Sequence, residues 1–158
     1  MKKAFSFLIL VFLCGTFSAR LSAELSMPHI FADHMVLQRN EAINLWGSAS
    51  PKEKVTVELN GQKTSVRADA SGKWNATLRP MEAGGPYTLI VKGKKERLAF
   101  DDVLLGEVWI CSGQSNMEFR LHAAMNAEKE IADAENYSFL RSFNVKQEMS
   151  HRPLSDLQ

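Results

Sequence analysis

The sequence lacks several features that would narrow its function. Neither sign of charge dominates, because 19 Lys and Arg residues stand against 18 Asp and Glu residues. This balance gives no reason to expect nucleic acid or an acidic surface as a partner. Internal repeats and low-complexity tracts are absent. Histidine is sparse, and the spacing of His29 and His34 forms no recognisable metal cluster, so we expect no metal site.

Cysteine is scarcer still, and the first of the two cysteines falls in an apparent N-terminal leader. Two lysines precede an apolar stretch, Ala4–Phe17, and small residues up to Ala23 offer a cleavage site. This pattern is typical of a signal peptide, so we expect residues 1–23 to be removed and the protein to be exported to the periplasm or beyond. A single membrane anchor is the alternative, but a spanning helix needs ~20 apolar residues. Cys111 then stands alone in an apolar strand, which predicts a buried, inert thiol.

Short strands separated by turns are predicted from residue 24 to residue 103. Val55–Leu59 alternates apolar and polar residues, and Asn60-Gly61 behind it is a typical hairpin turn. Six or seven strands at regular spacing favour an antiparallel β-sandwich of the immunoglobulin-like kind for residues 24–103. The expected strands are Val36–Gln38, Ile43–Trp46, Val55–Leu59, Lys63–Ala68, Trp74–Leu78, Tyr87–Val91 and Arg97–Phe100.

A modest hydrophobic core is expected inside this sandwich. Trp46 and Trp74 could stack on sugar rings, but aromatic residues in strands more often fill a core, which is the interpretation we favour. The other expected core residues are Leu45, Val57, Leu59, Leu78, Leu89 and Val91.

The pattern changes beyond the predicted sandwich. Val103–Ile110 is mostly apolar, as in a strand buried on both faces of a parallel sheet. Met117–Ala134 has apolar residues at helical spacing, and Phe139–Val145 has the composition of a second strand. Strand, helix and strand in this order form the opening of an α/β domain. We therefore expect residues 104–158 to begin such a domain without completing it, since domains typically run to ~100–150 residues.

One serine occupies the predicted junction between strand and helix. Gly113 permits a sharp turn there, and Ser115 follows it. A nucleophilic hydroxyl is favoured at the carboxyl end of a strand and the amino end of a helix, where the backbone stabilises developing negative charge. The competing interpretation is a helix cap, for which serine is among the commonest residues. Spacing alone leaves both interpretations open.

The complete block from Gly106 to Phe119, GEVWICSGQSNMEF, resembles the nucleophile block of the sialate O-acetylesterase family in the SGNH hydrolase superfamily. The segments MVLQRN, WGSASPKEKVTV and GKWNATLRPMEAGGPYTL resemble the sandwich that leads that family, and LRSFNV resembles its continuation. The resemblance covers nearly the whole mature chain and corresponds to the amino-terminal part of the family. It implies that Ser115 is the catalytic nucleophile, with Gly113, Gln114 and Asn116 in its loop and oxyanion support.

The resemblance also implies a chemistry: removal of O-acetyl groups from sialic acid or related sugars through an acyl-enzyme, without a cofactor. The superfamily takes its base from an Asp-x-x-His segment, which this sequence does not contain. His122 and His151 follow Ser115 but do not match that motif. We therefore expect these 158 residues to be an inactive fragment of the esterase. The alternative is a non-catalytic carbohydrate-binding or accessory module in which the serine block is a remnant.

Overall fold

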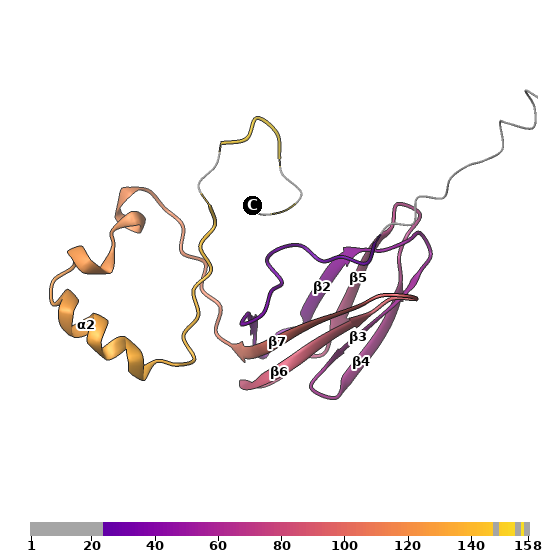
Figure 1. Cartoon of the computed structure of the whole chain (residues 1–158), viewed down its shortest axis with the longest axis horizontal. Coiled ribbons are helices and arrows are strands. Elements are labelled where there is room, and N and C mark those ends of the chain that lie inside the picture. Colours follow the sequence, from indigo (N-terminus) through magenta and orange to yellow (C-terminus); the bar gives the residue numbers. More distant parts are fainter. Residues whose placement is uncertain (1–23, 147–148, 154–155, 157–158) are drawn as a thin grey trace, which may run out of the picture.

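A computed structural model describes residues 24–146, 149–153 and 156. The predicted leader, residues 1–23, lies outside the described residues. Strands fill the first part of the chain and short helices follow (Figure 1). The strands are β1 (Val36–Gln38), β2 (Ile43–Ser48), β3 (Lys54–Leu59), β4 (Gln62–Arg67), β5 (Lys73–Leu78), β6 (Gly84–Lys92) and β7 (Arg97–Gly106).

Five of the strands form one mixed sheet in the order β1-β7-β6-β3-β4, and the other two form the ribbon β2-β5. Neighbours are antiparallel except β1 and β7, which run parallel with Val36 opposite Leu104. The sheet curls around the ribbon into an open half-barrel (Figure 1). The hydrophobic core lies in the hollow of that curve.

Alternating residues explain why these segments form strands. In β3, Val55, Val57 and Leu59 are buried while the residues between them face away from the core. β5 alternates in the same way. All the predicted core residues except Trp46 are buried. Trp46 is 42% exposed and packs edge-on against Phe31, so its predicted place in the core is wrong.

The predicted fold class is wrong, although strands occur at all seven predicted places. An immunoglobulin-like sandwich needs two antiparallel sheets, whereas here one sheet contains a parallel pair and the second is only a two-stranded ribbon. The physical cause lies in β7. Val103, Leu104 and Leu105 extend this strand instead of opening a new domain, and they are buried by pairing with β1 and β6. A continuous apolar run suits such a covered strand as well as it suits a parallel sheet.

Residues 107–146, here called the arm, leave the end of β7 and lie to one side of the sheet (Figure 1). The arm holds η1 (Ser115–Glu118), η2 (Leu121–Ala123), α2 (Ala127–Asp133) and η3 (Ala134–Asn136). The predicted strand-helix-strand opening of an α/β domain is therefore wrong within the described residues. The helix is broken into short turns, and Phe139–Val145 forms no strand.

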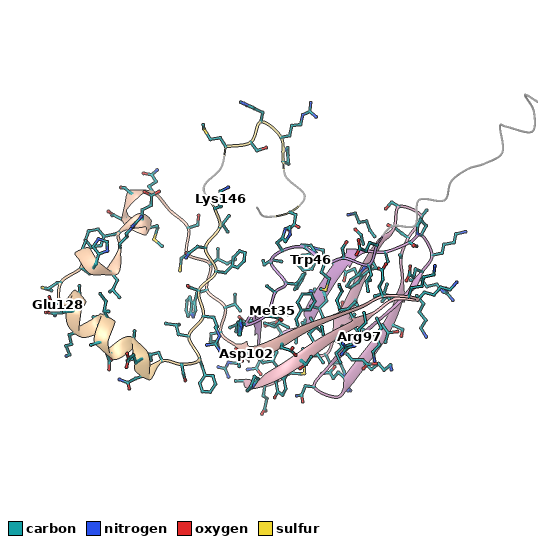
Figure 2. All side chains as sticks on the ribbon, viewed as in Figure 1. Met35, Trp46, Arg97, Asp102, Glu128 and Lys146 are labelled. Carbon is teal, nitrogen blue, oxygen red and sulfur yellow. The ribbon has the colours of Figure 1, made fainter. Side chains whose placement is uncertain are left out.

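The arm exposes apolar side chains that a folded domain would cover. No described residue after Leu105 is buried. Trp109 is 83% exposed and Ile110 93% exposed, so the expected burial of this segment on both faces is absent. Figure 2 shows the same contrast, with side chains packed along the sheet and splayed out from the arm. The other large exposed apolar residues of the arm are Val108, Met117, Phe119, Leu121, Met125, Ile131, Tyr137, Phe139, Leu140, Phe143 and Val145.

Candidate active site

Ser115 opens the short helix η1 and is exposed to solvent. The residue in the capping position is Gln114, and no side chain caps this helix. The turn is closed by the backbone, where Met117 N–H donates to the carbonyl oxygen of Gln114 at 2.8 Å. The helix-capping interpretation of Ser115 therefore does not apply, and its hydroxyl is not committed to the backbone of η1.

Gly113 leaves room for the side chain of Met117 to approach this loop closely. A Cβ atom at Gly113 would lie 2.5 Å from Met117 Cγ, closer than real contacts allow. Gln114 and Asn116 flank the serine, and both are exposed. The structure thus places Gly113, Gln114, Ser115 and Asn116 in one accessible turn, while their roles in catalysis stay predictions.

The surroundings of Ser115 differ from the predicted strand–turn–helix junction. β7 ends at Gly106, so an extended segment of eight residues separates the strand from the serine. η1 is a single turn of four residues, too short to develop the dipole of a long helix. Cys111 in the connecting segment is exposed, so the prediction of a buried thiol is wrong.

No catalytic base reaches Ser115 within the described part of the chain. His122 lies in η2 and is exposed, as is His151. Neither forms a hydrogen bond with the serine among the described residues. Among the described residues, no three His, Cys, Asp or Glu side chains gather into a group that could hold a metal ion.

The arm is anchored where it leaves the sheet. Glu107 accepts hydrogen bonds from Gln38 Nε2 at 3.1 Å and from Arg39 Nε at 2.6 Å. The amide of Val108 donates in turn to Gln38 Oε1 at 2.9 Å. The bond from Gln38, followed by the one from Arg39, holds the pKa of Glu107 below its ordinary value. Residues beside the end of β1 therefore fix the first step of the arm.

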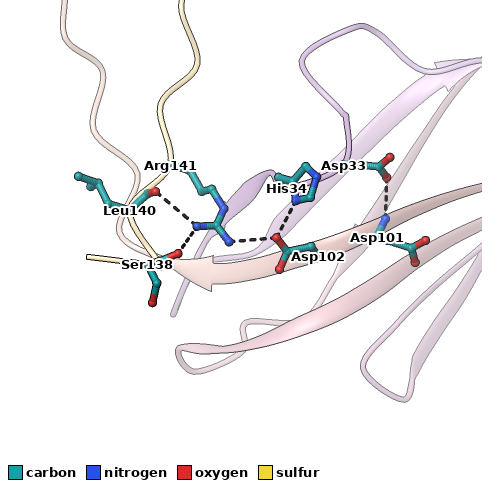
Figure 3. A network of polar contacts seen from close by, with 7 residues as sticks. All are labelled: Asp33, His34, Asp101, Asp102, Ser138, Leu140 and Arg141. Atoms are coloured by element: carbon teal, nitrogen blue, oxygen red, sulfur yellow. Dashed lines mark hydrogen bonds and ion pairs between the residues drawn. The ribbon is translucent and has the colours of Figure 1, made fainter. Parts of the chain in front are cut away.

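A second attachment forms at Asp102, which sequence reasoning did not identify (Figure 3). One oxygen of this carboxylate accepts hydrogen bonds from His34 Nδ1 at 2.7 Å and from Arg141 Nη2 at 2.9 Å. Arg141 also donates to the backbone carbonyls of Ser138 and Leu140. The bond from His34, followed by that from Arg141, lowers the pKa of Asp102. This ion pair docks the far part of the arm onto β7.

The signal for this attachment is a pair of aspartates inside an otherwise apolar strand. Asp102 has a positive φ of 53°, which turns its side chain out of the regular ladder. Its neighbour Asp101 accepts a hydrogen bond from Thr88 and donates its own amide to Asp33 at 2.7 Å. Burying a charged side chain costs free energy unless the charge is paired. Two aspartates between Phe100 and Val103 therefore indicate that a partner residue binds them, although the strand pattern does not identify which residue it is.

A third attachment joins the end of the described chain to the loop before β1. The amide of His29 donates to Asp156 Oδ1 at 2.9 Å, and His29 Nδ1 lies 3.0 Å from Asp156 Oδ2. Within the described residues, all three attachments consist of hydrogen bonds and ion pairs. Contacts of this kind weaken with salt far more than buried apolar contacts do.

No protein-family model matches the chain. Among curated proteins, the mouse sialate O-acetylesterase is 35% identical over 88% of this chain, and the human sialate O-acetylesterase is 36% identical over 78% of it. Among solved structures, a carbohydrate acetylesterase from Xanthomonas citri superposes with a TM-score of 0.80 at 38% identity and covers 85% of this chain. The resemblance seen in the sequence is confirmed by these matches.

The chain corresponds to only a part of each of these proteins. It spans 28% of the length of the mouse protein, 26% of the human protein and 31% of the bacterial structure. The similarity therefore concerns one portion of a longer type of polypeptide.

Proposed function

Because this chain is related to the sialate O-acetylesterases over part of their length, we propose that it contributes the nucleophile to a serine esterase that removes O-acetyl groups from sugars. The observation that carries the proposal is identity of 35% to 38% to two differently named acetylesterases. Sialic acid or a similar acetylated sugar is the proposed substrate. No cofactor enters this reaction.

Ser115 has the proposed role of nucleophile. Its Oγ attacks the acetyl carbonyl as its proton passes to a base. The ester C–O bond breaks, the sugar leaves as a free hydroxyl after taking that proton, and an acyl-enzyme remains. Water then hydrolyses the acyl-enzyme to acetate and regenerates Ser115. Backbone N–H groups of the loop help to hold the oxyanion, and losing one such donor typically costs ~100-fold or more in rate. What supports this role is the exposed hydroxyl of Ser115, which performs no capping duty, in a turn closed tightly by Gly113 and Met117.

A longer protein that contains this sequence provides the test. Acetate release from O-acetylated sialic acid and from p-nitrophenyl acetate would be measured for the parent, for Ser115→Ala and for Ser138→Ala. Ser138 is a second exposed serine of the arm and serves as the matched control. We expect Ser115→Ala to abolish turnover and Ser138→Ala to keep it. A parent enzyme that tolerates Ser115→Ala would remove the assignment.

The 158-residue chain alone should hydrolyse p-nitrophenyl acetate barely above background. A serine hydroxyl without a base is a weak nucleophile, and a positioned base typically contributes ~100- to 10,000-fold. Strong turnover by this chain, lost in Ser115→Ala, would show that His122 or His151 serves as base after all.

Export is also proposed, with cleavage near Ala23 and a periplasmic or extracellular location. The basic start, apolar core and small residues of the leader support it. Mass spectrometry of the mature amino terminus is the measurement, and a cytosolic protein that retains Met1 would contradict the proposal.

A further inference from the structure

The outer face of the five-stranded sheet concentrates positive charge that the overall composition conceals. Val55, Val57 and Leu59 of β3 point into the core, so Lys54, Thr56 and Glu58 point outwards. Strand pairing adds further cations to this face, because residues directly opposite each other in antiparallel strands share a face. Lys63 and Arg67 join from β4, Lys92 from β6 and Arg97 from β7.

Two pairs of like charges lie directly opposite each other on this face. Lys54 pairs with Arg67 across β3 and β4, and Lys92 pairs with Arg97 across β6 and β7. Like charges in such positions destabilise a sheet. Neither pair is needed to cover the core, because all four side chains lie on the opposite face. Lys92 is also bonded to Glu58, whereas Lys54 and Arg67 form no ion pair with any described residue. The charge of the first pair is therefore open to a partner of negative charge.

A hollow of about 700 Å³ opens beside these pairs, between β3, β4 and the loops at the start of β3 and the end of β6. Seven of its thirteen lining residues are Lys or Arg and two are Glu. Lys52, Lys94 and Lys95 supply the loop cations. No lining residue is aromatic, so the hollow offers no stacking platform of the kind that single-stranded nucleic acids use.

The carboxylates at this face are Glu53, Glu58 and Glu96, and each already accepts hydrogen bonds. Glu96 accepts the backbone amide of Leu25. Glu58 accepts Lys63 at 2.6 Å and Lys92 at 3.2 Å. Glu53 accepts the backbone amides of Lys94 at 2.6 Å and Ser50 at 3.2 Å, and the first of these bonds leads the lowering of its pKa.

The remaining cations of the face form no ion pair with any described residue. They are Lys52, Lys54, Arg67, Lys94, Lys95 and Arg97. The charge of Lys94 also acts on Glu53, and the charges of the other five are open to an external anion.

We propose that this basic face binds a carbohydrate chain that carries carboxylate groups, at a place separate from Ser115. The choice of carbohydrate rests on the proposed function, and the negative charge rests on the face itself. β7 has ten residues from Arg97 to Gly106, a span of ~30 Å, and the arm leaves from its far end (Figure 1). The face therefore anchors a long acidic glycan while the turn of Ser115 works on another part of it, and two contacts on one chain raise the local concentration of substrate.

The binding experiment uses fluorescein-labelled polysialic acid and fluorescence anisotropy with the 158-residue chain at low and high salt. Dextran is the neutral glycan control and duplex DNA is the control for unselective polyanion binding. The variant Lys54→Gln/Arg67→Gln/Lys94→Gln removes three exposed charges of the face. The matched variant Lys73→Gln/Arg79→Gln/Lys129→Gln removes three exposed charges elsewhere.

We expect saturable binding of polysialic acid that weakens with salt, and none of dextran. The face variant should lose about tenfold in affinity, given the usual worth of exposed ion pairs, while the matched variant stays near the parent. Equal losses in both variants, or duplex DNA bound as tightly as polysialic acid, would overturn the proposal.

A melting experiment separates lost binding from lost structure. Because the face variant removes the opposed charges of Lys54 and Arg67, its Tm should equal or exceed that of the parent by a few degrees. A lower Tm would remove the argument that these charges are kept against stability. Ser115→Ala should bind polysialic acid normally. If the longer enzyme deacetylates its substrate but does not bind polysialic acid, only the proposed basic binding face is refuted. If it binds polysialic acid but does not deacetylate, only the proposed esterase function is refuted.

Discussion

Two leucines of the same chain should respond very differently to the same substitution. Leu45 in β2 is 0% exposed and faces the core, whereas Leu140 in the arm is 78% exposed. Truncating a buried leucine to alanine removes its transfer free energy and leaves a cavity, which together cost ~2–5 kcal/mol. The same change at an exposed position stays within ~0.5 kcal/mol.

These free energies predict a clear difference in melting temperature. For a domain of ~60–100 residues, each 1 kcal/mol shifts Tm by ~4–8 °C. Leu45→Ala should therefore lower the Tm of the folded strands by ~8 °C or more, and Leu140→Ala by no more than ~4 °C. Circular dichroism and tryptophan emission would follow unfolding. Trp74 is 3% exposed and Trp109 is 83% exposed, so the change in emission reports mainly on the core around Trp74.

Limited proteolysis tests the same difference in stability between the strands and the arm. Cleavage should begin within residues 107–146 and leave the strands as a resistant core, because local opening is easiest where few apolar contacts are buried. A Leu140→Ala protein that melts as low as Leu45→Ala would refute the reasoning, since it would mean that the arm is packed as tightly as the sheet. Cleavage spread evenly over both regions would count against it equally.

Four further outcomes follow from the arm and the ribbon. Hydrogen bonds from His34 and then Arg141 lower the pKa of Asp102 in the folded protein. The contact between Asp102 and the arm should therefore be fully present above the ordinary aspartate pKa of ~3.9 and be lost as pH falls through the lower folded pKa. Amide hydrogen exchange of the arm would measure this loss. Asp102→Asn should loosen the same amides at neutral pH. Cys111 is exposed, so a thiol reagent should modify it in the native protein as fast as in urea, and protection would contradict the described arm. Gly47→Ala should lower Tm, because its Cβ would lie 2.0 Å from a backbone carbonyl oxygen, and an unchanged Tm would show that the ribbon can shift.

The strands could be predicted from the sequence because their signals are local. Alternation in Val55–Leu59 and the turn residues Asn60-Gly61 act over a few positions, and β3 and β4 pair as that pattern requires. The topology could not be predicted in the same way. Whether Val103–Leu105 begins a new domain or ends β7 depends on the parallel partner β1, more than sixty residues earlier. A run of apolar residues predicts that a strand is buried, but it does not identify the elements that pack against the strand.

The helix predicted for Met117–Ala134 failed for a related reason. Its apolar residues recur at helical spacing, but a helix of this length gains most of its stability in a protein from packing that face against a partner. Met117, Leu121 and Ile131 are each about half exposed, so nothing covers the face within the described structure. Only Ala127–Asp133 keeps regular α-helical bonding. The turn of Ser115 is therefore predictable as a motif, and its helical setting is not.

The distribution of charge on the surface could not be predicted from the overall composition. A net charge of +1 argues against an acidic partner only if positive and negative side chains are mixed over the surface. Residues 50–97 contain ten Lys and Arg against five Asp and Glu, and the register places most of those cations on the face turned away from the core. Period-two alternation decides which of them share that face, and pairing decides that Lys54 meets Arg67 and Lys92 meets Arg97. The clustering of positive charge that would select an anionic ligand thus depends on strand register. The net charge of the whole sequence does not reveal it.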